Sequence, residues 1–142
     1  MKAKYGLYYV ACKVFLRKSN KLFIFKDRYG DWDIPGGRIL DREFSAPLEL
    51  VIKRKIREEL GSGIRYRLGK PLVSMRHERK EISLRKRVRI FAIGYEAKFL
   101  GGPIRLSSQH TEFLWVSVKT FKPNKYFRGG WFKGVKEYLK SI

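Results

Sequence analysis

Two neighbouring carboxylates, Glu58 and Glu59, are the residues of this chain best suited to chemistry. They end a segment with helical spacing, and successive helical residues stand about 100° apart around the axis, so both can reach one cation at that edge. Upstream, Gly36-Gly37 lets the backbone bend close to such a cation and offer a carbonyl oxygen. Mg²⁺ or Mn²⁺ takes oxygen ligands of this kind, neutralises a diphosphate and orients an attacking water. The pattern therefore predicts a metal site for diphosphate chemistry.

Two further residues belong to the same pattern. Arg54 lies four residues before Glu58, on the same helical face, and Glu43 lies in the turn before the helix. The run from Arg54 to Gly61, with Gly37 six residues before Glu43, resembles the Nudix box of hydrolases that cut nucleoside diphosphates linked to another moiety. The preceding Trp-Asp-Ile-Pro-Gly-Gly adds to that resemblance. The resemblance places six residues at box positions: Gly37, Glu43, Arg54, Glu58, Glu59 and Gly61.

The resemblance also implies roles for these residues. Metal ligation would come from the carbonyl of Gly36 with Glu58 and Glu59, and Arg54 would orient the glutamates. The fold implied is α/β, a Nudix-like α/β/α sandwich with a central mixed β-sheet, formed as a single domain over residues 1–142.

The chain departs from the box in two ways. Ten residues separate Glu43 from Arg54, three more than usual, which fits a longer loop or an added turn before Pro47. Lys55 stands where the family has a glutamate that ligates metal or acts as general base. Its positive charge should weaken metal binding, and an ion pair with Glu59 one turn later would occupy that carboxylate. Another carboxylate has taken over the role, or activity survives with fewer ligands, or the fold serves binding alone.

Few acids are available to replace the missing glutamate, because residues 61–142 hold only five. Glu112, just before a predicted strand, is the first choice and joins Arg54, Glu58 and Glu59 as an expected catalytic residue. Three others are candidates for which a surface ion pair is the simpler role: Glu78, Glu81 and Glu96. The two histidines, His77 and His110, are expected to make ordinary hydrogen bonds, with His110 the candidate acid or base beside a phosphate.

Three residues are expected to bind substrate. Arg38 is placed to contact a phosphate, directly after the glycine turn. Trp32 is either core or the wall of a nucleobase pocket. Tyr126 lies between Pro123 and Gly129 and is open to a loop on the substrate side, whereas Trp131 is expected to pack the last helix onto the sheet.

The charge of the chain is strongly basic. Thirty-three Lys and Arg against 13 Asp and Glu give a formal net charge of +20, and residues 61–142 carry most of it. Such a surface attracts polyanions through phosphate neutralisation and counterion release, although it also suits a solvated surface without a partner. Seven basic residues gather between positions 76 and 89, where a hairpin would carry them as an arm: Arg76, Arg79, Lys80, Arg85, Lys86, Arg87 and Arg89.

The elements that position these residues follow from local patterns. Strands are predicted over 5–17 and 21–26 as a hairpin, over 64–76 and 82–97 as a pair, and over 113–118. A helix is predicted from about Ser45, its N-cap, to Leu60, with an apolar stripe at helical spacing. A last helix follows Gly129-Gly130. Strands of this kind with two helices imply a sheet covered on both faces.

Some classes are excluded at this stage. No apolar run approaches the ~20 residues that cross a bilayer, and no signal-peptide pattern opens the chain. Cys12, the single cysteine, is expected to be a buried thiol. We therefore expect a cytoplasmic protein without a membrane partner, with a homodimer as the candidate assembly. The expected function is hydrolysis of a nucleotide-derived diphosphate with Mg²⁺ or Mn²⁺. The alternative is a catalytically degenerate module that binds RNA or a ribonucleoprotein such as the ribosome.

Overall fold

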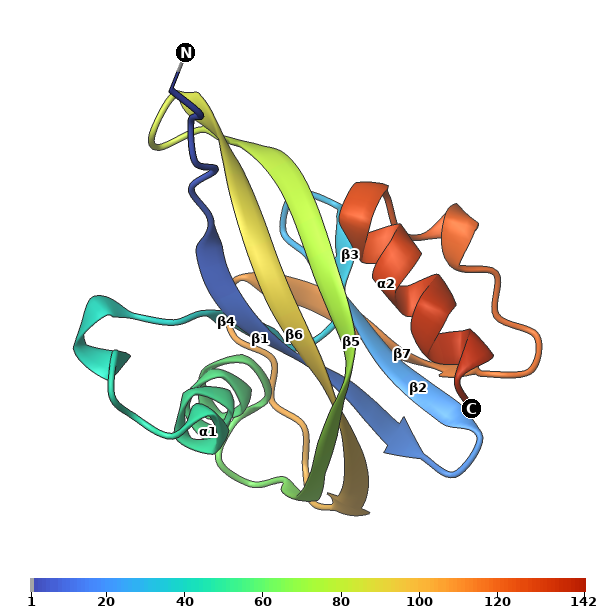
Figure 1. Ribbon diagram of the computed structural model, residues 1–142. Helices are drawn as coiled ribbons and strands as arrows, with labels where there is room; N and C mark the ends of the chain where they lie inside the picture. The colour runs from blue at the N-terminus through green and yellow to red at the C-terminus, as the bar shows by residue number, and fades with distance from the viewer. Residues whose placement is uncertain (1) are drawn as a thin grey trace.

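A mixed seven-stranded sheet forms the centre of the computed structural model, which describes residues 2–142 (Figure 1). Five strands follow the order β3-β2-β1-β6-β5, while β4 pairs with β1 and β7 pairs with β2. The strands are β1 (Tyr9–Lys18), β2 (Lys21–Asp27), β3 (Trp32–Asp33), β4 (Gly36–Arg38), β5 (Arg65–Glu81), β6 (Lys86–Gly101) and β7 (His110–Ser117). The β1 and β6 strands run parallel and the other pairs antiparallel, so the sheet is mixed as predicted.

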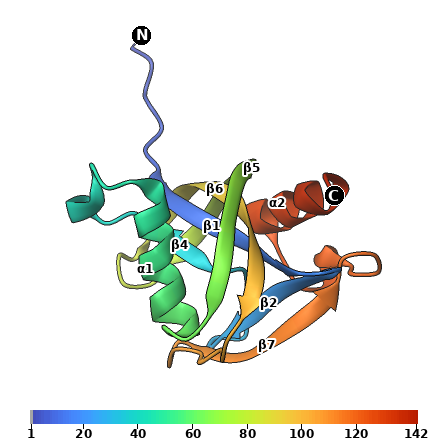
Figure 2. The ribbon, with the colours of Figure 1, turned by 90° about the horizontal axis from the view of Figure 1, so that it is seen from below.

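Two helices cover opposite faces of the sheet, as Figures 1 and 2 show for α1 (Leu48–Leu60) and α2 (Gly129–Lys140). Two short 3₁₀ turns, η1 (Asp41–Glu43) and η2 (Pro123–Lys125), precede these helices. The predicted α/β/α sandwich with a central mixed sheet is confirmed. No helix within residues 2–142 has the length and apolar character of a bilayer span.

The strand β1 contributes side chains to two separate hydrophobic cores because its side chains alternate between the faces of the sheet. Cys12, Val14 and Leu16 belong to the core under α1, whereas Ala11 and Phe15 belong to the core under α2. The apolar stripe of α1 completes the first core with the buried side chains Val51, Ile52, Ile56 and Leu60. Full burial of one such side chain contributes about 1.5–3 kcal/mol, which fixes α1, and the carboxylates at its end, against the sheet.

The boundaries of several elements differ from the sequence predictions. The helix α1 begins at Leu48, with Pro47 rather than Ser45 as its N-cap residue. Proline disfavours the helical conformation in the residue before it, so the helix does not extend upstream. Residues 44–47 therefore form a loop between η1 and α1.

The hairpin of β5 and β6 is longer than predicted. The strand β5 continues to Glu81 and β6 begins at Lys86, with the turn between them at residues 82–85. The strand β1 begins at Tyr9 rather than Tyr5, and β7 begins at His110 rather than Phe113. Figure 1 shows the tip of the β5–β6 hairpin extending past both helices toward the N-terminus.

Candidate functional site

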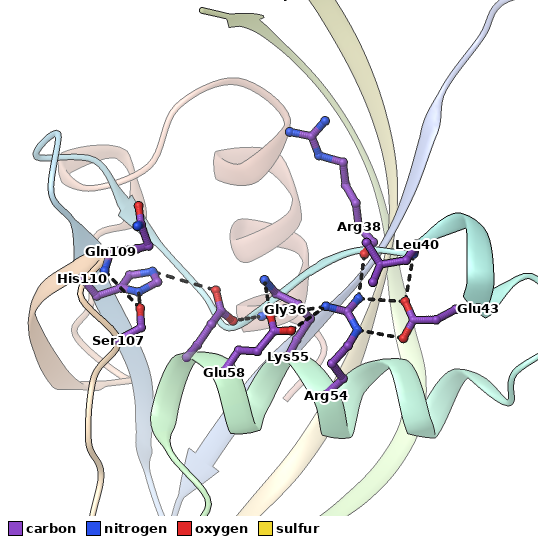
Figure 3. Close-up of polar contacts among 11 residues, drawn as sticks. Gly36, Arg38, Leu40, Glu43, Arg54, Lys55, Glu58, Ser107, Gln109 and His110 are labelled. Carbon is purple, nitrogen blue, oxygen red and sulfur yellow. Dashed lines mark hydrogen bonds and ion pairs between the residues drawn. The ribbon is translucent and has the colours of Figure 1, made fainter. Parts of the chain in front are cut away.

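The last turn of α1 and the strand β4 meet at one buried contact (Figure 3). The backbone N–H of Gly36 donates a 2.8 Å hydrogen bond to Oε1 of Glu59, whose residue is only 8% exposed. Gly36 has φ +122°, and a Cβ there would stand 2.1 Å from the carbonyl oxygen of Cys12. Only glycine allows this approach, so the glycine turn fixes the orientation of the carboxylate.

The environment of Glu59 raises the pKa of its carboxyl to about 7. Loss of solvation is the main cause, and the charges of Lys13 and Lys55 and the Gly36 N–H oppose it in part. A carboxyl with this pKa exchanges a proton near neutral pH, which suits general acid–base chemistry.

His110 faces the other oxygen of this carboxylate. Its Nε2 lies 3.9 Å from Oε2 of Glu59, its Nδ1 lies 3.1 Å from Oγ of Ser107, and its ring stacks on Phe25. Burial lowers the pKa of His110 while burial raises that of Glu59. Both shifts disfavour the charged form of each group, and at 3.9 Å the two side chains are adjacent without a direct hydrogen bond.

The loop that supplies His110 was expected to supply Glu112. The β2–β7 ladder instead sets Glu112 opposite Lys26, and the two side chains pair at 3.0 Å. The group from this part of the chain that contacts Glu59 is therefore the imidazole of His110.

Arg54 connects three parts of the box. Its Nε and Nη2 each donate a 2.8 Å hydrogen bond to Glu43, its Nη2 also donates to the carbonyl of Arg38, and its Nη1 donates to Glu58 at 3.1 Å (Figure 3). The hydrogen bonds from Arg54 hold the pKa of Glu43 below its ordinary value. The bidentate geometry positions Glu43 across the lengthened loop.

Glu58, half exposed, accepts from two cations. Lys55 Nζ lies 3.3 Å from its Oε2, in addition to the contact with Arg54. Burial acts to raise the pKa of Glu58, but the hydrogen bond from Arg54 and the charge of Lys55 outweigh it, so the pKa is lowered. The expected pairing of Lys55 with Glu59 is not what the structure has, because the Glu59 carboxylate turns inward to Gly36.

The donors available to a metal are of the right chemical type. Glu58 and Glu59 are successive residues at the end of α1, and their carboxylates and the carbonyl of Gly36 are hard oxygen donors. Within residues 2–142 no group of three or more His, Cys, Asp or Glu side chains is placed to hold a metal. The donor set thus fits one divalent ion with few protein ligands, in competition with the ammonium of Lys55.

The two aromatic residues expected at the substrate, Trp32 and Tyr126, come together although they are distant in sequence. Their rings meet edge to face with centroids 5.3 Å apart, and both line a cavity of about 610 Å³. Trp131, expected only to pack the helix, also lines this cavity and stacks on His77.

A buried ion pair at the cavity was missed from the sequence. Lys13 is 4% exposed, and its Nζ lies 3.0 Å from both carboxylate oxygens of Asp33, which lines the cavity. The Nζ also lies 5.1 Å from the ring centroid of Trp131. A lone lysine within the apolar stretch from Val10 to Leu16 was the signal that could have revealed it.

Arg38 does not point at the carboxylates. Its guanidinium pairs with Glu81 at 2.8 Å and lies over the ring of Tyr9, and Figure 3 shows it directed away from Glu58 and Lys55. Its backbone carbonyl, which accepts from Arg54, is its contact with the box. The remaining candidate acids also sit in local contacts: Glu78 with Arg87 and Arg89, and Glu96 with Arg17 and Tyr138.

Comparison with known proteins connects the chain to a fold. No protein-family model matches the chain, and no curated protein matches it. A MutT protein from Methanosarcina mazei Go1 superposes with a TM-score of 0.74 at 19% identity, covering 98% of this chain and 97% of the other. A NUDIX hydrolase from Nitrosomonas europaea superposes with a TM-score of 0.71 at 15% identity, covering 97% of this chain and 73% of the other. An ADP-ribose pyrophosphatase from Streptococcus suis 89-1591 superposes with a TM-score of 0.68 at 12% identity, covering 95% of this chain and 92% of the other. The chain therefore has the Nudix fold.

Proposed function

We propose, from the fold that this chain shares with MutT and Nudix hydrolases, that it cleaves the diphosphate linkage of a nucleoside diphosphate derivative with the help of Mg²⁺ or Mn²⁺. The observation that carries the proposal is the Gly36–Glu59 hydrogen bond with Glu58 beside it and Arg54 holding Glu43. Gly36, Glu58 and Glu59 would hold the ion. When bound, such an ion neutralises phosphate charge and lowers the pKa of a water ligand.

The chain's own residues contribute the proton chemistry. The Gly36 N–H fixes Oε1 of Glu59, which leaves Oε2 facing Nε2 of His110. Glu59 is the candidate general base through Oε2, the oxygen that does not accept from Gly36, and a bound cation would lower the pKa of about 7 that burial gives this carboxyl. His110 is the neighbouring titratable group, with Nε2 3.9 Å from Oε2 of Glu59. Arg54 positions the carboxylates of Glu43 and Glu58 through the hydrogen bonds that it donates to them.

The aromatic cavity is the proposed nucleoside subsite. Trp32 and Tyr126 offer faces and edges to a base, while Arg79, Lys80 and Arg128 on the same wall offer positive charge to phosphates. The Streptococcus suis neighbour is by its name an ADP-ribose pyrophosphatase, which supports a nucleotide derivative as the substrate class. Cytoplasmic location and oligomeric state remain predictions.

A turnover screen tests the proposal. The purified chain is incubated with a panel of nucleoside diphosphate derivatives and Mg²⁺ or Mn²⁺, and released nucleoside monophosphate or phosphate is measured. Glu59→Gln should lower turnover by about 10²-fold or more. Glu49→Gln, on the exposed first turn of the same helix, is the matched control and should retain activity. A wild-type rate no higher than that of Glu59→Gln on every compound would refute the hydrolase.

A second candidate function, a degenerate module that binds RNA or a ribonucleoprotein such as the ribosome, is favoured by two observations. Lys55 neutralises a carboxylate that a metal would need. In the part of the β5–β6 hairpin between positions 76 and 89, four exposed basic side chains have no ion-pair partner within residues 2–142: Arg76, Lys80, Arg85 and Lys86.

Salt-dependent RNA binding distinguishes this second candidate. Changing those four residues to Gln should weaken binding and reduce the slope of log affinity against log salt by up to about 3, at ~0.7 per single-strand phosphate contact. Four exposed residues away from the hairpin give a charge-matched control, also changed to Gln: Lys53, Arg57, Lys119 and Lys140. Equal loss in the two quadruple variants would argue against an RNA-binding arm.

A further inference from the structure

The ammonium of Lys55 lies inside the candidate site rather than out in solvent. The side chain is 22% exposed, and Nζ is 3.3 Å from Oε2 of Glu58. Its charge also acts on the buried carboxylate of Glu59. Lys55 therefore places a positive charge beside Glu58 and close enough to Glu59 to act on its carboxylate.

Gly37 gives Lys55 the room to lie there. Its φ is outside the left-handed region, so its backbone conformation does not by itself require glycine. A Cβ on Gly37 would, however, stand 2.5 Å from Cε and 3.1 Å from Nζ of Lys55. The glycine thus serves as the space over which the lysine side chain extends, and the ammonium is packed against the backbone of β4.

The donors of this ammonium are only partly used. An ammonium has three N–H donors, and Glu58 is its one ion-pair partner within residues 2–142. Glu58 is itself shared with Arg54, and the main partner of Arg54 is Glu43. Lysine binds phosphate as a compact point charge, so the free donors of Lys55 match a phosphate oxygen.

We propose that Lys55 is a resident cation of this site and binds a phosphate group of a diphosphate directly, without a divalent ion. The inference rests on the proposed function for its class of ligand, and it assigns to Lys55 the part of the charge neutralisation that a second metal ion would supply. Gly37 is then a positioning residue, because it acts through Lys55.

Calorimetry with inorganic diphosphate in EDTA at 150 mM salt tests this role. The wild type should bind, and Lys55→Met should bind at least tenfold more weakly. Lys53→Met removes an exposed charge from the same helix and should stay within about twofold of the wild type. Absence of binding by the wild type in EDTA, or equal weakening in the two variants, would overturn the proposal.

Gly37→Ala keeps the positive charge of Lys55 but changes its position. Gly37→Ala should displace the Lys55 side chain and weaken diphosphate binding at least fivefold, while Lys55→Arg should retain most of it. Tight binding by Gly37→Ala would contradict the positioning role of this glycine. The turnover screen answers a separate question: Lys55-dependent binding without hydrolysis would refute the enzyme and leave this inference standing, whereas hydrolysis without metal-free binding would do the reverse.

Discussion

The backbone N–H of Gly36 and the Oε1 of Glu59 lie 2.8 Å apart, which joins β4 to the last turn of α1. This one hydrogen bond connects the glycine turn of the sequence motif to its final carboxylate. The positive φ of Gly36 and the closeness of Cys12 leave no room for a side chain. Orientation of the carboxylate therefore depends on a residue that contributes no side-chain chemistry.

Replacement of Gly36 should be severe. Gly36→Ala combines a strained backbone with a clash against the carbonyl of Cys12, and we expect a loss on the order of 3 kcal/mol in the free energy of unfolding. Gly30→Ala is the control, since Gly30 also has positive φ but open space around it, and it should cost about 1 kcal/mol. Urea denaturation measures both. Similar losses of unfolding free energy in the two variants would show that backbone strain alone, and not the close approach of Cys12 to Gly36, causes the destabilisation.

Glu59 should make stability fall as pH rises from about 4.5 to 7. Its pKa is raised from 4.5 to about 7 in the folded chain, so the folded state retains the proton over this range while the unfolded state loses it. Each pKa unit is about 1.4 kcal/mol, which gives ~3 kcal/mol over the interval. Glu59→Gln keeps an acceptor for Gly36 without the charge. It should match the wild type near pH 4 and exceed it near pH 8 in thermal denaturation. A variant less stable than the wild type at pH 8 would contradict the burial cost.

Arg54→Lys should loosen the lengthened loop of the box. Lysine retains the charge but cannot make the two parallel bonds that hold Glu43. We expect trypsin to cleave after Arg42, the residue before Glu43, several-fold faster in this variant, as followed by mass spectrometry. Arg57→Lys, exposed on the same helix, should not change cleavage at that position. Unchanged cleavage in Arg54→Lys would mean that the loop is held by other contacts.

Lys55→Glu should strengthen the metal affinity that Lys55 weakens. The change removes a cation 3.3 Å from Glu58 and adds a third carboxylate to the same edge of α1. We expect Mg²⁺ or Mn²⁺ to bind at least tenfold more tightly than in the wild type by calorimetry without nucleotide. Lys53→Glu adds the same charge outside the site and should change affinity little. An equal gain in metal affinity in both variants would mean that the change in net charge alone, and not the position of the new carboxylate, causes the tighter binding.

The architecture could be predicted from the sequence because the motif and the apolar patterns pointed to the same fold. The apolar residues of α1 and the motif around it agree with the confirmed sandwich, and the β1–β2 hairpin followed from short-range patterns. The start of α1 could not be placed, because a serine with capping chemistry competed with the proline two residues later. Pro47 sets the start of α1, since it restricts both its own backbone and that of Ala46.

Residue spacing alone predicted contacts of the candidate site only where its residues are close in sequence, whereas the family resemblance also grouped Gly36 with Glu59. The bond between Arg54 and Glu58 follows from helical spacing, whereas the contact of His110 with Glu59 joins β7 to α1 and depends on strand pairing. Arg38 was expected at a phosphate, but Glu81 lies within its reach at the end of the unexpectedly long β5. Lys13 escaped notice because a buried lysine is rare and its partner Asp33 is 20 residues away.

The division of the interior by β1 has a consequence for how this chain could be altered. Tyr126 and Trp131, which pack on the α2 side, also wall the cavity, whereas Glu59 is carried by a helix packed on the α1 side. Substitutions at the aromatic walls would therefore leave the packing of the carboxylate helix unchanged. Libraries restricted to those walls could sample new ligands while the proposed catalytic carboxylates stay constant, a separation that directed evolution can exploit.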